Sequence, residues 1–248
     1  MINNRILIII TIYFLTTNSC NMKKKDLNEP LAEKINKVLS LHGHDRIDEY
    51  YWLNERESPK VIDYLNAENE YRNSYMKEYS SLEENLFQEI KGRIKEDDST
   101  VPYFENGYYY YTRYEKNKQY PIYCRKKENL EASEEIMLNV NEMSKGHDYY
   151  RIGGIEISPN NKIAAFGVDT VSRRLYTIYF KNLETGEIFD DEIPYTTGSV
   201  TWTNDNETIY YDKKDTETLR TERVMKHYIE TNIKNDEEIY FEEDETFS

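Results

Sequence analysis

Nucleophilic catalysis by a serine would need three groups: a serine on a strained strand-to-helix turn, a histidine that takes its proton, and a carboxylate that orients the histidine. The sequence contains no G-x-S-x-G motif for such a turn, and the segment Gly198-Ser199-Val200 lacks that frame and falls in a predicted strand. Surface or structural roles are predicted for all four histidines, which are His42, His44, His147 and His227. The 47 Asp and Glu residues form no recognisable acid–base pair. We therefore predict no catalytic residue in this chain.

Cysteine is the other residue type with reactive chemistry, and the chain has two. Cys124 lies in the strand-like segment IYCR, where a buried and inert thiol is expected rather than a nucleophile. Cys20 belongs to the leader described below, so no internal disulfide is predicted. No His/Cys pair has the spacing of a metal site, and we predict neither a metal nor another cofactor.

The leader, residues 1–19, has the pattern of a bacterial export signal. Arg5 supplies a short positive region, and residues 6–15 form an almost wholly apolar run that is too short for a bilayer, which takes ~20 residues. A small residue followed by Cys20 then makes a loose lipobox, which predicts that Cys20 is lipidated and anchors an exported protein in the cell envelope. An ordinary cleaved leader with an incidental cysteine is the alternative. A polar tether is expected over residues 20–41.

The chain is strongly acidic. Its formal net charge is −15, and it combines 32% charged residues with only 38% hydrophobic ones. Binding to nucleic acid or to anionic lipid needs basic patches, so this charge argues against both, and a membrane is reached only through the lipid on Cys20. A cationic peptide would be attracted. More commonly, such a negative charge serves only to keep the protein soluble.

The elements that must position any site begin with a helical stretch. Ser58 is expected to cap a helix and Pro59 to take its first position. From there apolar residues recur at steps of three and four and mark one stripe along a helix. The stripe consists of Tyr64, Ala67, Tyr71, Tyr75, Tyr79, Leu82, Leu86 and Ile90. Ser81 and Glu84 have capping-box spacing, which predicts a division into two helices near Ser80. The stripe is expected to dock on another domain.

After residue 98 the sequence changes to short strands, rich in β-branched and aromatic residues and separated by turn sequences. Strands are predicted over residues 108–114, 122–126, 136–140, 163–168 and 176–181. A weak repeat aligns ISPNNKIAAF (157–166) with WTNDNETIYY (202–211), each of them a strand, a polar turn and a second strand. A period of ~40–50 residues that holds several antiparallel strands is typical of propeller blades.

The available length limits this propeller. Residues 99–248 have room for about three blades at that period, whereas propellers close with typically 4–8 blades. Three blades leave two open sheet edges, and the acidic segment 236–245 would have to protect one of them. The sequence therefore predicts a mainly β fold, with an N-terminal helical segment and an incomplete β-propeller.

Five blocks of the sequence resemble the prolyl oligopeptidase family of serine peptidases, most closely its protease II (oligopeptidase B) branch. They are HGHDRIDEYYWL (42–53), GRIKEDDSTVPY (92–103), GYYYYTRYEKNKQYPIYCRKK (107–127), ISPNNKIAAFGVDT (157–170) and TTGSVTWTNDNETIYY (196–211). The EEDETF segment that ends at Phe247 also fits. The likeness extends over residues 42–247 in one order, so it does not rest on a single motif.

The resemblance implies a division of labour. In that family a helical segment before the propeller packs on a C-terminal α/β-hydrolase domain, and a seven-bladed propeller covers the active site and admits only short peptides. Residues 42–98 would be the segment that docks on the hydrolase, and residues 99–248 would be about the first three blades. The leader departs from the family, whose members of this branch are mostly intracellular. No catalytic residue can be carried over, because the matching blocks lie outside the hydrolase domain.

Three functional hypotheses follow, and the sequence leaves them open. The first is the N-terminal, substrate-gating part of a serine oligopeptidase that hydrolyses short peptides after Lys or Arg. A second is a lipid-anchored module that binds peptides without cleaving them. The third is an inactive, truncated remnant, which the open propeller edges and the undocked helical stripe favour for the isolated chain.

Overall fold

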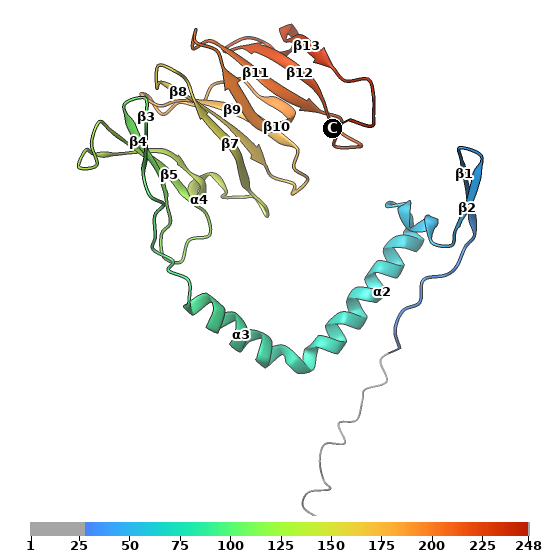
Figure 1. Ribbon diagram of the computed structural model, residues 1–248. Coiled ribbons are helices and arrows are strands. Elements are labelled where there is room, and N and C mark those ends of the chain that lie inside the picture. The colour runs from blue at the N-terminus through green and yellow to red at the C-terminus, as the bar shows by residue number, and fades with distance from the viewer. Residues whose placement is uncertain (1–27, 248) are drawn as a thin grey trace, which may run out of the picture. The chain divides into compact units, whose positions relative to one another are not determined.

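Two units make up the chain, Met1–Ile94 and Lys95–Ser248 (Figure 1). The structure is a computed structural model that describes residues 28–247. The predicted leader and the lipidation site at Cys20 lie outside the described residues, as does the first part of the expected tether.

The first unit begins with a hairpin of β1 (Lys37–Leu41) and β2 (His44–Asp48), so a strand occupies the end of the segment expected as a tether. His42 and Gly43 form its two-residue turn with φ of 53° and 78°, as a tight hairpin turn between twisted strands requires. Helical elements follow: η1 (Tyr51–Asn54), α2 (Pro59–Met76), η2 (Lys77–Tyr79) and α3 (Ser80–Gly92).

The helix boundaries confirm most of the prediction. Ser58 is at the N-cap position and Pro59 at the first helical position, although the Ser58 hydroxyl makes no capping hydrogen bond. The division near Ser80 is confirmed, since one 3-10 turn separates α2 from α3. The capping box is wrong, because Ser81 lies inside α3 and Tyr79 is its N-cap. The turn from α2 into α3 stays close to helical geometry, which leaves no extended residue for a serine to cap.

Lysines lie over the aromatic residues of the Tyr50-Tyr51-Trp52 cluster. The Nζ atom of Lys37 is 4.0 Å from the centre of the Tyr51 ring, and Lys60 Nζ is 4.9 Å from that of Trp52. Trp52 also donates its indole N–H to the Glu33 carbonyl at 2.8 Å. Cation–π attraction and this hydrogen bond thus join the hairpin, the segment that precedes it and the start of α2.

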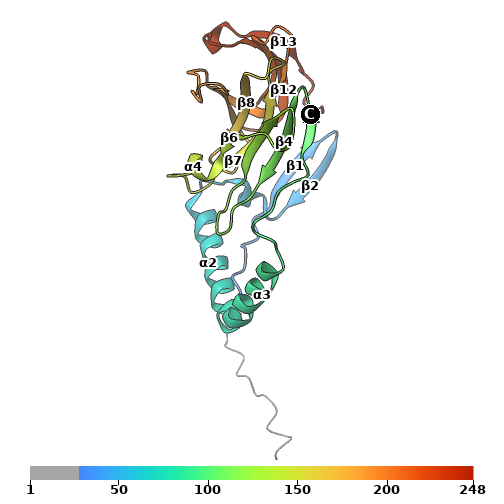
Figure 2. The ribbon, with the colours of Figure 1, turned by 90° about the vertical axis from the view of Figure 1, so that its left-hand side faces the viewer.

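The second unit contains three four-stranded blades (Figures 1 and 2). Blade 1 is one antiparallel sheet of β3 (Tyr103–Glu105), β4 (Tyr108–Arg113), β5 (Ile122–Lys127) and β6 (Glu134–Asn139). A short helix, α4 (Val140–Met143), follows it. The other sheet has seven strands, in the order β13-β12-β11-β10-β9-β8-β7. Its strands are β7 (Arg151–Ile157), β8 (Ile163–Asp169), β9 (Tyr176–Asn182), β10 (Ile193–Trp202), β11 (Thr208–Lys214), β12 (Thr221–Tyr228) and β13 (Glu237–Phe241).

Two blades share strand β10. Its first half pairs with β9 at Ile193 and Thr196 and completes blade 2, while its second half pairs with β11 from Val200 to Trp202 and begins blade 3. The register shifts between the two halves, where Tyr195 and Gly198 have φ of 63° and 89°. A bulge of this kind turns one strand from one sheet plane into the next. The prediction of about three blades is confirmed, and they form no closed ring within the described residues.

The five predicted strands are present as β4, β5, β6, β8 and β9, with ends within two residues of the prediction. Two residues of the predicted strands lie outside the observed ones: Tyr114 follows the end of β4, and Val140 starts α4 instead of extending β6. The repeat is confirmed as well. Each copy is the end of one strand, a polar turn and the next strand, first from β7 into β8 and then from β10 into β11.

The core lies in the two seams between blades. Blade 2 is covered on both faces, since Ala165 of β8 packs with the cluster toward blade 3 while Phe166 and Val168 pack with the cluster toward blade 1. Alternation in β9 buries Ile178 and Phe180 completely in the seam with blade 3. Burial of these side chains from water is the main stabilising contribution to the stack of blades.

Candidate functional site

The first strand of each blade in chain order is called its leading strand. Each leading strand has an edge without a strand partner among residues 28–247. They are β3, β7 and the part of β10 after Gly198. The indole N–H of Trp202 on β10 donates to the Glu156 carbonyl on β7 at 3.1 Å, which places two of these leading strands side by side (Figure 1). The exposed side chains on β7 and on the part of β10 after Gly198 are polar, whereas Tyr103 and Phe104 of β3 are 59% and 56% exposed.

The leading strands carry two carboxylates, and β7 also begins with the exposed Arg151. Glu105 ends β3 and Glu156 lies near the end of β7, and both side chains are exposed. Partial burial raises the pKa of Glu156, and repulsion from the Glu105 carboxylate raises it further. The Glu105 carboxylate therefore lies near that of Glu156.

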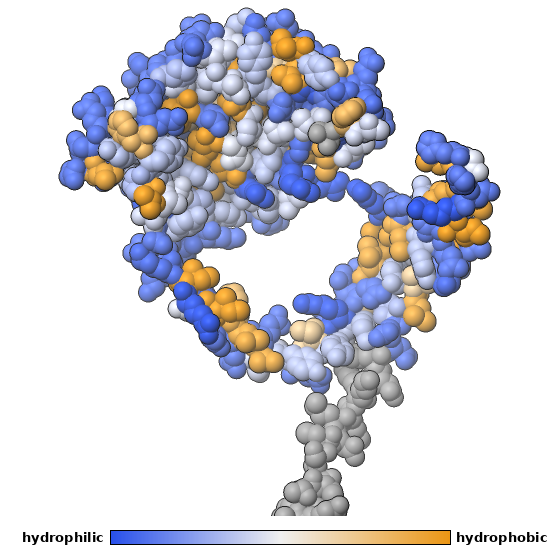
Figure 3. Space-filling model, in the orientation of Figure 1, coloured by the Kyte–Doolittle hydropathy of each residue, from blue (hydrophilic) through white to orange (hydrophobic). Residues whose placement is uncertain are grey.

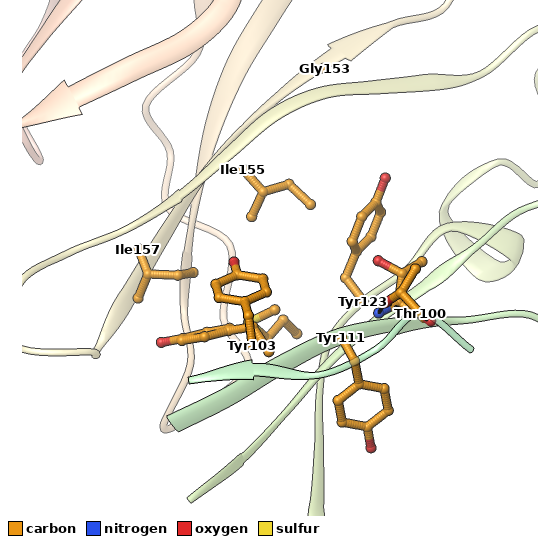
Figure 4. A pocket seen from close by; sticks show the side chains of 10 residues that line it. Thr100, Tyr103, Tyr111, Tyr123, Gly153, Ile155 and Ile157 are labelled. Carbon is orange, nitrogen blue, oxygen red and sulfur yellow. Dashed lines mark hydrogen bonds between the residues drawn. The ribbon is translucent and has the colours of Figure 1, made fainter. Parts of the chain in front are cut away.

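A cavity of about 270 Å³ opens between blade 1 and strand β7 (Figure 4). Tyr103 and Tyr123 point from blade 1 toward Ile155 and Ile157 of β7, whereas the Tyr111 ring points away. The remaining lining residues are Thr100, Tyr110, Thr112, Met137 and Gly153. Burial raises the pKa of Tyr103 and Tyr123, so both phenols stay neutral. The cavity can accommodate an apolar or aromatic group, and its lining holds neither a base nor an activated nucleophile.

Polar contacts close blade 1 against blade 2 beside this cavity. The Asn161 amide donates to the Asn106 carbonyl at 2.9 Å, and Asn106 donates back to the Pro159 carbonyl at 2.6 Å. Arg125, which is 3% exposed, donates to the Asn161 carbonyl at 2.7 Å and lies over the Tyr108 ring at 4.1 Å. Asn161 itself has φ of 63°, a conformation that asparagine tolerates better than most residues.

Glycines allow β10 to press against blade 2. A Cβ atom on Gly167 of β8 would lie 2.4 Å from the Gly198 Cα, and one on Gly154 of β7 would lie 2.3 Å from the Ser199 Oγ. A side chain at Gly154 would push β7 away from β10, and a side chain at Gly167 would push β8 away from β10. Ser199 is therefore confirmed as a strand residue, and it does not lie on a strand-to-helix turn.

The sequence matches the family model of the prolyl oligopeptidase N-terminal β-propeller domain over residues 30–248. This chain belongs to the prolyl oligopeptidase family. Dipeptidyl aminopeptidase BI of Pseudoxanthomonas mexicana is 39% identical to it in an alignment 234 residues long, which covers 88% of this chain and 32% of that protein. Protease 2 of Moraxella lacunata is 33% identical, over 88% of this chain and 33% of its own length.

Solved structures agree with this family assignment. Oligopeptidase B from Leishmania major superposes with a TM-score of 0.82 at 29% identity, over 88% of this chain and 33% of that structure. Oligopeptidase B from Trypanosoma brucei, solved in a closed form with covalently bound antipain, gives a TM-score of 0.78 at 26% identity. The chain spans about a third of the length of these relatives, and the matched third is their N-terminal propeller portion.

The histidines of this family member fall into two groups. His42 and His44 are exposed on the β1–β2 hairpin, and His147 follows α4 with its ring 5.3 Å from that of Tyr150. Within the described part of the chain, no serine hydroxyl forms a hydrogen bond with a histidine ring. His227 differs from the other three because it is fully buried.

His227 sits between two carboxylates, a cluster that the sequence did not predict. Its Nδ1 atom is 2.7 Å from Asp236 Oδ1 and its Nε2 atom is 3.4 Å from Asp191 Oδ2. The ring stacks on Phe180 at 6.0 Å, and Tyr211 donates its hydroxyl to Asp236 at 2.8 Å. Burial alone would lower the pKa of His227, but attraction and hydrogen bonds from Asp236 and Asp191 outweigh it and raise that pKa. A surface or structural role was predicted for this histidine, as for the other three, and its carboxylate partners come from distant positions in the sequence.

The remaining thiol is unreactive, and the carboxylates and histidines form no metal site in the described range. Cys124 is completely buried, as predicted, and burial raises its pKa to about 12, which keeps it a neutral thiol. Among residues 28–247 no group of three His, Cys, Asp or Glu side chains is arranged to hold a metal ion. No helix in that range is long and apolar enough to cross a membrane.

Proposed function

We propose that this chain is the propeller portion of a serine-type oligopeptidase of the oligopeptidase B kind, and that it limits substrates to short peptides. The observation that carries the proposal is the set of three blades whose leading strands β3, β7 and β10 lie at unpaired inner edges, in a chain that spans a third of its relatives. The serine, histidine and aspartate of the triad would then belong to a hydrolase portion outside these residues.

We further propose that the substrates are basic, with cleavage after Lys or Arg. Glu105 and Glu156 support this proposal. A Lys or Arg side chain of a peptide that reaches the leading strands would meet these two neighbouring carboxylates. The net charge of −15 acts in the same direction at longer range and speeds the approach of cationic peptides at low salt. The proposal predicts that a peptide with lysine replaced by glutamine is a poorer substrate of the whole enzyme.

The helical segment would provide the contact with the hydrolase portion. Leu82, Leu86, Phe87 and Ile90 of α3 are between 48% and 61% exposed and form an apolar stripe along that helix (Figure 3). Contiguous exposed apolar surface of this kind marks an interaction site. We assign the stripe to docking on the hydrolase portion, in line with the resemblance.

The test is a complementation assay with an arginyl amide substrate. The 248-residue chain alone is expected to give no turnover, and a separately expressed hydrolase portion, read from the coding sequence after codon 248, should become active when the chain is added. Leu86→Lys with Ile90→Lys should abolish this rescue, while Gln88→Lys on the same helix should preserve it. Turnover by the chain alone that a serine-directed inhibitor abolishes would contradict the assignment of the triad to another portion.

Export and lipidation at Cys20 complete the proposal. The leader pattern supports both, and the protein would be held in the bacterial cell envelope by its lipid rather than by a membrane span. Growth with an alkyne-labelled fatty acid should label the parent chain and the Cys124→Ser variant, but not Cys20→Ser. Labelling that survives Cys20→Ser would refute the anchor.

A second candidate is a peptide-binding module without catalysis, and the edge strand β13 favours it. Its outer edge has no strand partner among the described residues, and Ile239 and Tyr240 are about half exposed on it. Such an edge can accept an extended peptide by strand addition. Saturable binding of a Lys-rich peptide to the chain, with no need for a hydrolase portion, would support this module. A chain that neither binds nor complements would instead be an inactive remnant.

A further inference from the structure

The Asp191–His227–Asp236 cluster has more acceptors than a neutral histidine can serve. Both ring nitrogens face a carboxylate oxygen, and an ionised carboxylate only accepts hydrogen bonds. A neutral imidazole has one N–H, so one of its nitrogens would turn a lone pair toward a carboxylate in a buried setting. The imidazolium has two N–H donors and fits both partners. The geometry therefore favours a protonated ring.

The cluster joins parts of two blades. Asp191 precedes β10, whose first half is the outermost strand of blade 2, whereas His227 lies in β12 of blade 3. Asp236 follows η3 (Ile233–Asn235) and leads into β13, the last strand of blade 3. Asp191 also accepts the backbone N–H of Glu230 at 2.5 Å, which ties the connection before β10 to the end of β12.

Solvent can reach this cluster from one side. A hollow of about 340 Å³ is lined by Asp190, Asp191 and Glu192 of the connection before β10, together with residues 231–233. Asp191 is thus at once part of this hollow and a partner of the buried ring. Protons can exchange with His227 through the Asp191 side without unfolding of the blade.

We propose that Asp191, His227 and Asp236 form a pH-sensitive latch that holds blade 2 to blade 3 while the histidine is protonated. Loss of the proton removes one of the two N–H donors, leaves a buried carboxylate without its charge partner, and releases the connection before β10. The other groups that face the cluster do not titrate in its range. Tyr211 remains a neutral phenol, because burial and Asp236 raise its pKa, and Glu230 contributes only a backbone N–H.

The sign of the pH dependence follows from the direction of the shift. The pKa of His227 in the folded protein is raised above 6.5, its ordinary value in an unfolded chain. The latch is therefore fully closed below pH 6.5 and is lost as the pH rises through the folded pKa. Asp190 and Glu192 line the hollow beside Asp191.

Histidine-selective NMR of the 248-residue chain gives the first test. The His227 ring should have the chemical shifts of an imidazolium at pH 6.5 and titrate above that value. A His227 ring that is neutral at pH 6 would overturn the proposal. This measurement needs no variant, so it stands even where a substitution impairs folding.

Hydrogen exchange measures the latch itself. After correction for base-catalysed exchange, protection of the Glu230 amide should be constant below pH 6.5 and fall up to tenfold per pH unit above the folded pKa. Asp191→Asn should abolish this pH dependence and lower the His227 pKa, whereas Asp190→Asn, the same change one residue away, should preserve it. His227→Gln should give pH-independent protection. An unchanged pH profile in either Asp191→Asn or His227→Gln would show that the cluster is only a structural contact.

Discussion

Replacing Gly167 with alanine should force apart the seam where blade 3 begins against blade 2. The new Cβ would lie 2.4 Å from the Gly198 Cα, 2.5 Å from its carbonyl oxygen and 2.9 Å from its carbonyl carbon. Carbon atoms pack at about 3.5–4.0 Å, so the strands must separate by about 1 Å. All three contacted atoms belong to backbone, and no flexible side chain can move aside in their place.

The expected loss of stability is near the upper end of what overpacking costs. Extra methylene groups in a packed core cost about 1–3 kcal/mol, and here strand backbone resists on both sides of the contact. The lower entropy of the unfolded alanine chain offsets about 0.4–1 kcal/mol of this. A net loss of about 2 kcal/mol follows, which corresponds to a fall in Tm of about 4–8 °C for a unit of this size.

Thermal unfolding followed by the near-UV signal of the blade tyrosines measures this loss. Gly92→Ala is the matched control, because a Cβ at Gly92 has no atom within 4 Å and its backbone is helical. The control should stay within about 0.5 kcal/mol of the parent. If Gly167→Ala melts together with the parent and the control, the close approach of β10 to blade 2 does not hold in solution.

Three further outcomes test the seams. In a Cys20→Ser chain, the Cys124 thiol should not react with a disulfide reagent until the protein unfolds, because burial raises its pKa to about 12; rapid reaction under native conditions would contradict its burial. Asn161→Gly should cost about 1–2 kcal/mol for the lost contacts with blade 1, and Asn161→Ala about 1 kcal/mol more for its positive φ, so equal urea midpoints would disprove the backbone argument. Arg125→Gln should lower stability by about 2–3 kcal/mol, measured by the same urea titration, since it loses the Asn161 carbonyl and Glu135; a change below about 0.5 kcal/mol would mean that this buried guanidinium holds nothing together.

Local sequence patterns predicted much of the fold. The predicted strands β4, β5, β8 and β9 combine β-branched and aromatic residues with turn sequences at their ends, and that information lies within each segment. The hairpin of β1 and β2 was not predicted, because its strands KVLSL and HDRID contain many polar residues and bury little. Sharing of β10 was beyond the sequence patterns too, since a blade boundary within one strand depends on a bulge.

The functional groups were harder to predict than the strands. His227 has an ordinary strand sequence around it, and its partners are 36 residues before it and 9 residues after it. Only the folded sheet brings the three together. The cavity beside β7 similarly combines Tyr103 and Tyr123 of blade 1 with Ile155 of blade 2. The His227 cluster and this cavity both depend on how the blades stack. The spacing of residues in a single sequence does not show which side chains of different strands come together.

Strand β10 makes the three blades mechanically unequal. Blades 2 and 3 are continuous through one backbone with ladder hydrogen bonds on both sides, so a force that separates them must bend that strand. Blade 1 reaches blade 2 through α4, a loop, a hydrophobic cluster and side-chain hydrogen bonds such as those of Asn161 and Arg125, without a shared strand. Compliance is therefore concentrated at the first seam, next to the tyrosine-lined cavity. Under a force that pulls the blades apart, we expect blade 1 to separate from blade 2 before blade 2 separates from blade 3, because no strand is shared at the first seam.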